Sequence, residues 1–118
     1  MTTRTLTRLP RIAAPVAALW YAFGLSQAIA GYVADAAAAP LVIWIVYAVA
    51  CSAGLVGAAA LAFAPARAAA AFATSLVAAA IYFSWLFTFG TPTGEDYGVG
   101  AAVMTVTLIL LWAARRLR

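Results

Sequence analysis

The stretch that decides the fold is Leu41–Phe89, which reads LVIWIVYAVACSAGLVGAAALAF-APAR-AAAAFATSLVAAAIYFSWLFTF. Its two apolar runs, Leu41–Phe63 and Ala68–Phe89, are separated only by the short segment APAR. One straight helix over both runs would be about 73 Å long, more than twice the roughly 30 Å hydrocarbon core of a bilayer. Pro65 interrupts helical hydrogen bonding, and Arg67 is costly at the centre of a membrane. The stretch therefore predicts two membrane-crossing helices joined by a tight hairpin.

Two further apolar runs flank this stretch, Ile12–Val33 on one side and about Tyr97–Ala114 on the other. The segment TPTGED at positions 91–96 is polar and rich in turn-forming residues, so it predicts the third loop. Of the 118 residues, 68% are hydrophobic and only 8% are charged, against roughly 25% charged residues in soluble domains. The sequence therefore predicts one all-α domain over residues 1–118. This domain is expected to be an integral membrane bundle of four transmembrane helices, which span about 12–33, 41–63, 68–89 and 97–114.

The charged residues divide by sign between the two ends of such a bundle. The arginine end carries Arg4, Arg8, Arg11, Arg67, Arg115, Arg116 and Arg118, and the acidic end carries Asp35, Glu95 and Asp96. Loops rich in arginine stay in the cytoplasm, so both termini are expected on the cytoplasmic side, N-in and C-in. The alanine-rich, lysine-free composition fits a GC-rich bacterial coding sequence, which indicates the bacterial cytoplasmic (inner) membrane.

The first run has one competing interpretation. Basic residues, an apolar stretch and Ala28-Ile29-Ala30 together have the outline of a secretory signal peptide. The run is about 22 residues long, however, against the 7–15 apolar residues of a signal peptide, and it carries Ser26 and Gln27 near the supposed cleavage site. We expect the first helix to remain uncleaved.

Several kinds of chemistry are excluded by what the sequence lacks. It contains no histidine, and Cys51 is its single cysteine, so no histidine-ligated haem, zinc site or intramolecular disulfide is expected. Glu95 and Asp96 are adjacent in a predicted loop, without a His, Lys or Cys partner for acid–base work. The arginines are split among three segments with no aromatic platform for bases between them. We therefore expect no catalytic residues, cofactor, metal or nucleic-acid partner.

Small residues recur at helical spacing within the runs. In lipid, small residues let helices approach closely, and this approach stabilises their association. Gly24 and Gly31 share a face of the first run, and Gly54 and Gly57 mark overlapping small-residue seams in the second. These glycines are expected to pack the bundle internally, or alternatively to form a homodimer seam. Leu61 is expected to face lipid.

A few side chains that end in a polar group lie among the aromatic residues in the half of the runs nearer the acidic end. Gln27, Tyr47 and Tyr82 each lie about 9–10 Å below that membrane boundary, since each is six or seven residues from the end of its run. Lipid offers no hydrogen bonds at this depth, so the three groups are expected to face the bundle interior. With Trp85, they form a candidate aromatic cup for a small molecule. The Ser and Thr residues of the runs are expected to bond to their own helices.

A weak family resemblance spans most of the chain. Trp20-Tyr21-x-x-Gly24-x-x-Gln27, Gly54-x-x-Gly57, Ser75-Leu76 and the ending Leu111-Trp112-Ala113-Ala114-Arg115-Arg116 carry it. In these residues the chain resembles a group of small bacterial four-helix membrane proteins, sometimes loosely labelled sugar transporters. The resemblance implies the four-helix topology and a transporter function.

Two functions fit these observations. The first is an accessory or assembly subunit, packing through its small-residue seams against a second copy or a larger membrane complex. The second is a passive carrier or binder of a small solute, using the aromatic cup. A proton-driven pump is disfavoured because the runs contain no carboxylate or basic side chain.

Overall fold

The chain forms a bundle of four long helices in a computed structural model that describes residues 3–90 and 94–116. The elements are α1 (Thr3–Ala34), the 3-10 turn η1 (Ala36–Ala38), α2 (Leu41–Phe63), α3 (Pro65–Phe89) and α4 (Gly94–Arg116). All four α-helices are long and apolar enough to cross a membrane, and the described residues contain no strand. The prediction of an all-α bundle with four membrane-spanning helices is confirmed.

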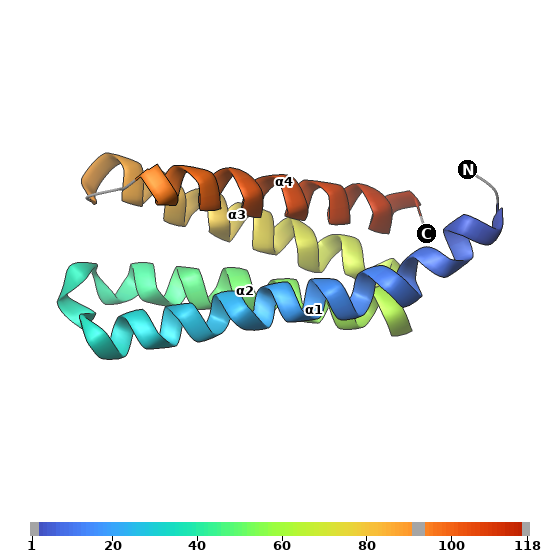
Figure 1. Cartoon of the computed structure of the whole chain (residues 1–118), viewed down its shortest axis with the longest axis horizontal. Helices are drawn as coiled ribbons and strands as arrows, with labels where there is room; N and C mark the ends of the chain where they lie inside the picture. The colour runs from blue at the N-terminus through green and yellow to red at the C-terminus, as the bar shows by residue number, and fades with distance from the viewer. Residues whose placement is uncertain (1–2, 91–93, 117–118) are drawn as a thin grey trace.

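The helices run up and down in chain order, and packing follows the same order. α1 packs on α2, α2 on α3 and α3 on α4, while the described parts of α1 and α4 make little backbone contact. The bundle measures 49 × 22 × 19 Å. Figure 1 shows the start of α1, the end of α4 and the α2–α3 junction at one end of the bundle, and η1, the end of α3 and the start of α4 at the other. The two helical hairpins therefore meet through α2 and α3 and leave an edge between α1 and α4.

The predicted hairpin in the deciding stretch is confirmed, and its turn is very short. Ala64 alone separates α2 from α3, and Pro65 occupies the first turn of α3. Proline is favoured there because the first N–H groups of a helix have no intrahelical partner. The Ala64 N–H donates to the Ala60 carbonyl at 2.6 Å, and the Arg67 N–H donates to the Ala64 carbonyl at 2.9 Å. These bonds close the chain reversal at the arginine end.

The ends of α1 and α4 differ from the predicted limits. α1 begins at Thr3, before the apolar run, because its polar N-terminal segment continues the helix past the span. α4 begins at Gly94, so Glu95 and Asp96 lie in its first turn and not in a loop. Carboxylates are stabilised there by the positive end of the helix dipole. The rest of the predicted loop, 91–93, lies outside the described residues.

The α1–α2 connection is fixed by one tryptophan. The Trp44 indole N–H donates to the Ala36 carbonyl of η1 at 3.0 Å. Its ring meets Tyr32 edge-on, with 5.8 Å between ring centroids. A Cβ at Gly31 would lie 3.2 Å from the same ring, so this position has little room for a side chain. Trp44 thereby joins the end of α1, the short turn and the start of α2.

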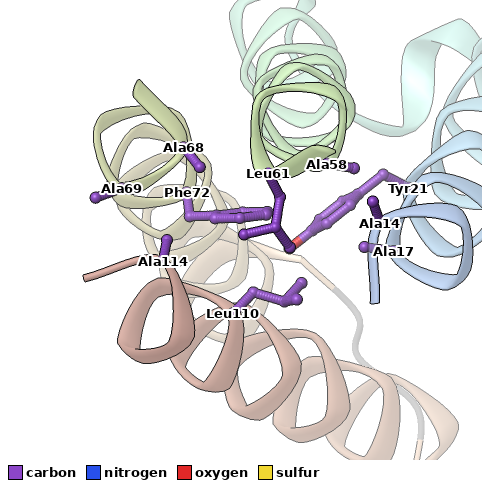
Figure 2. Close-up of a cluster of buried hydrophobic side chains, with 10 residues drawn as sticks. All are labelled: Ala14, Ala17, Tyr21, Ala58, Leu61, Ala68, Ala69, Phe72, Leu110 and Ala114. Carbon is purple, nitrogen blue, oxygen red and sulfur yellow. The ribbon is translucent and has the colours of Figure 1, made fainter. Parts of the chain in front are cut away.

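The main core lies in the half of the bundle nearer the arginine end, and all four helices contribute to it. Figure 2 shows Tyr21, Leu61 and Phe72 converging from α1, α2 and α3, with Leu110 beneath them on α4. Leu61 and Phe72 are completely buried. The expectation that Leu61 faces lipid is therefore wrong. Hydropathy cannot separate a core leucine from a lipid-facing one, because lipid is as apolar as the protein interior.

The predicted packing glycines lie against side chains of neighbouring helices. A Cβ at Gly54 would overlap the Tyr21 ring, and one at Gly57 would lie 2.7 Å from the Phe72 ring. At Gly24 the nearest atom is the Cys51 Sγ, 3.1 Å from the added Cβ. The sequence predicts that small residues bring two helix backbones together. In the structure these glycines instead leave room for rings and a thiol, so α2 receives an aromatic side chain from each neighbour.

Candidate functional site

The α1–α4 edge of the bundle contains a groove of about 380 Å³. We call it the binding groove. Its volume lies at the lower end of the roughly 300–1,000 Å³ found for small-molecule pockets. All four helices line it, and most of its walls are apolar. Its lining residues are Trp20, Tyr21, Phe23, Gly24 and Gln27 of α1, Tyr47, Ala50 and Cys51 of α2, Ser75, Ala79, Tyr82 and Phe83 of α3, and Glu95, Val99 and Val103 of α4.

Two interhelical hydrogen bonds close the binding groove from below. The Tyr21 Oη lies 2.7 Å from the Thr107 Oγ1, which joins α1 to α4. The Ser75 Oγ donates to the Ala50 carbonyl at 2.7 Å, which joins α3 to α2. Thr107 is completely buried and Ser75 is 1% exposed. These two bonds, one between α1 and α4 and one between α3 and α2, give the groove a polar floor, and the groove opens above it toward the acidic end.

The prediction that Ser and Thr bond to their own helices is right for Thr74 and wrong at this floor. The Thr74 hydroxyl donates to the Ala70 carbonyl at 2.9 Å, one turn back along α3. Ser75 and Thr107 instead bond to other helices. The position of Tyr21 in the sequence indicates that its hydroxyl needs a partner inside the bundle, because Tyr21 lies near the middle of its run and too far from the lipid headgroups to bond to them. Its partner 86 residues away could not be identified by spacing.

A series of aromatic contacts leads from the binding groove to the start of α4. Tyr47 and Tyr82 meet edge-on, with ring centroids 4.6 Å apart. Tyr82 contacts Phe83 at 5.1 Å, and Phe83 stacks on Phe87 at 5.9 Å. Phe87 then lies parallel to Tyr97 of α4 at 4.6 Å. Offset-stacked and edge-to-face pairs of this kind stabilise an arrangement beyond the area that they bury. The wall formed by Tyr47, Tyr82 and Phe83 is therefore connected by ring contacts to α2, α3 and α4.

Three of the four residues of the predicted cup lie on the binding groove. Tyr47 and Tyr82 form part of one wall, and Gln27 lines the α1 side, where its side chain is exposed. Trp85 does not belong to the lining. It follows Ala78 and Ile81 at helical spacing, and those two residues line a shallow apolar cleft between α2 and α3 instead. Trp85 is predicted from its place among the aromatic residues toward the acidic end, and position along a helix does not determine the face on which a residue lies.

The acidic residue Glu95 was missed as a lining residue. The sequence placed it in a loop, whereas the first turn of α4 brings it to the mouth of the groove. The separation of acidic and basic residues along the sequence predicts an acidic end of the bundle, but it does not indicate which carboxylate faces the opening of the groove. In the part of the chain that the structure describes, no group of three or more His, Cys, Asp or Glu residues is placed to hold a metal ion.

The arrangement has the chemistry of a recognition site. Most of the lining is apolar or aromatic, two interhelical hydrogen bonds lie at the floor, and Gln27 and Glu95 add polar groups on the way to the opening. No family model, curated protein or solved structure matches this chain.

Proposed function

We propose that this chain is a multi-pass membrane protein that binds a small, largely apolar molecule in the binding groove. The observation that carries the proposal is a groove lined by all four helices, with Gln27, Tyr47 and Tyr82 as polar tips on apolar walls. Such pockets combine apolar surface, which supplies affinity, with a few placed polar groups, which supply orientation. The proposal contains no catalytic step and no energy source, so any transport would be passive.

The open edge between α1 and α4 favours ligand binding over the alternative, in which the chain serves only to pack against other membrane helices through its small residues. Interior space in a helical bundle is normally filled by side chains to a density like that of organic crystals. Here the glycines predicted as seams are already occupied by Tyr21, Phe72 and Cys51 of the same chain. They are not free for a second copy, whereas the groove above the Tyr21–Thr107 bond is open.

We further propose that the arginine end faces the cytoplasm of a bacterial inner membrane, so that the binding groove opens outward. The basis is the division of charge along the sequence, since cytoplasmic loops are enriched in Lys and Arg. The binding groove would then be reached from the periplasmic face or sideways from the outer leaflet.

The test is native mass spectrometry of the protein released gently from its own membrane. We expect a bound small molecule in the wild-type protein and its loss in Val99→Trp, because Val99 lines the groove and an indole there fills it. Leu108→Trp is the matched control: it adds the same ring to an exposed position of α4 outside the groove. A wild-type mass equal to that of the polypeptide alone, or equal binding in Val99→Trp, would overturn the proposal.

The accessory-subunit hypothesis retains one specific observation in its favour. Gly94 and Gly98 of α4 are four residues apart, both are exposed, and a Cβ at either would meet no atom within 4 Å. Glycines at this spacing allow close approach of a partner helix. If they serve this purpose, Gly98→Leu converts an oligomer or complex to the monomer mass in the same experiment. A monomer before and after the substitution would contradict this second candidate.

A further inference from the structure

One charged side chain lines the binding groove, and it is acidic. Glu95 lies in the first turn of α4 at the acidic end of the bundle. Asp35 and Asp96 lie at the same end, whereas the sequence has no Lys or Arg between Ile12 and Ala66 or between Ala68 and Ala114. A cleft lined by one sign of charge with low-dielectric walls raises the local concentration of the opposite ion. The opening of the groove therefore attracts cations and repels anions.

The walls next to this opening are aromatic. Tyr47, Tyr82 and Phe83 stand on one side, and Phe23 of α1 stands on the other. Trp20 lies deeper in the groove, at the level of the Tyr21 floor. The negative π-face of an aromatic ring attracts a cation, most strongly where water is excluded. Tyr47 and Tyr82 are held in an edge-to-face pair, so their positions are defined before any ligand binds. A carboxylate and several rings around one small volume are the chemistry that recognises an alkylated ammonium group.

We propose that the ligand of the binding groove is an organic cation, a small molecule with an apolar body and one positively charged nitrogen. This inference rests on the binding function proposed above and specifies its ligand class. The charge lies at the opening on the side of Glu95, and the apolar body extends inward toward Ala79 and Val103. Asp96, in the same first turn of α4, acts electrostatically on both Tyr47 and Tyr82 and adds to the negative field at this opening. A neutral ligand would gain no attraction from the Glu95 carboxylate, and an anion would be repelled by it.

A pair of probes with one shape and different charge tests this inference. Benzyltrimethylammonium and neopentylbenzene differ only by nitrogen in place of a quaternary carbon, so they separate the effect of charge from that of shape. The full chain is ¹⁵N-labelled in lipid nanodiscs, and the four tryptophan indole signals are followed during titration. Trp20 lines the binding groove and reports occupancy. Trp112, at the other end of α4, reports non-specific partitioning in the same spectrum.

Two isosteric variants then locate the charge that matters. Glu95→Gln removes the carboxylate of the binding groove and keeps the shape of the side chain. Asp35→Asn is the matched control, because it removes one negative charge from the same end at a residue that does not line the groove. The backbone fold of both variants is checked from the remaining amide signals.

We expect a saturable shift of the Trp20 signal, with an affinity for the cation about tenfold higher than for neopentylbenzene. Glu95→Gln should lower this preference, with Asp96 maintaining part of it, and Asp35→Asn should preserve it in full. Equal affinities for the two probes, or equal losses in the two variants, would overturn the cation assignment. If neopentylbenzene still saturated the Trp20 signal, the groove would remain a binding site for neutral ligands. No saturable shift with either probe would overturn the binding function as well.

Discussion

Tyr21 and Thr107 join the first and last helices of the bundle through one hydrogen bond of 2.7 Å between their hydroxyl oxygens. Tyr21 is 3% exposed and Thr107 is completely buried. The bond spans the edge where α1 and α4 otherwise make little contact, and it lies directly beneath the binding groove. Its position makes it both a structural tie between the two helical hairpins and the lower limit of the site.

Removing this bond should lower stability by a modest amount. Interhelical hydrogen bonds in membrane proteins contribute about 0.6 kcal/mol on average and rarely more than about 1.7 kcal/mol. We expect Tyr21→Phe and Thr107→Val each to lower the free energy of unfolding by about 0.5–1.5 kcal/mol. Unfolding in mixed micelles with increasing SDS, followed by circular dichroism, measures the change. The double variant should lose less than the sum of the two, and strict additivity would show that the bond contributes nothing.

Substituting the glycines of α2 by alanine should lower the free energy of unfolding, because neighbouring rings leave no space for the added methyl group. Gly54→Ala places a methyl group in the Tyr21 ring and Gly57→Ala places one against the Phe72 ring. Overpacking of this kind typically costs about 1–3 kcal/mol. The matched control is Gly98→Ala, whose methyl group meets no atom within 4 Å. The same SDS titration should rank the control near the wild type, and equal stability of all three variants would contradict the packing described here.

The helices were predictable from sequence because their cause is local. Apolar length set the limits of α2, and Pro65 with Arg67 required the chain reversal that the structure places at Ala64. The faces of the helices were less predictable, as Leu61 and Trp85 show. A bilayer gives lipid-facing and core positions the same apolar composition, so the periodicity that reveals the buried face of a soluble helix is weak here. The contacts of Tyr21 and Ser75 depend on residues far along the chain, which no local pattern identifies.

The orientation of the bundle is a separate prediction that rests on charge alone. A reporter that is active only in the cytoplasm should be active when fused after Arg118, and one active only in the periplasm should be silent. Moving Arg4, Arg8 and Arg11 into the connection around Asp35 should weaken or invert this result, because short arginine-rich segments resist translocation. Periplasmic activity of the fusion in the unaltered protein would refute the orientation and the outward opening of the binding groove.

The last prediction concerns the accessibility of Gln27. Gln27 lines the binding groove, whereas Ile29, two residues further along α1, is 59% exposed and lies outside the lining. In a Cys51→Ala background, Gln27→Cys should react with a positively charged, membrane-impermeant thiol reagent added outside intact cells. Ile29→Cys should stay unreacted, because the thiolate that attacks such reagents does not form in hydrocarbon. Labelling is read as a mass shift of the purified protein. If Gln27→Cys is protected while Ile29→Cys reacts, Gln27 faces lipid, and its amide is lost from the proposed site. If both react to the same extent, α1 is exposed to water along its whole outer half, and the groove has no closed α1 wall.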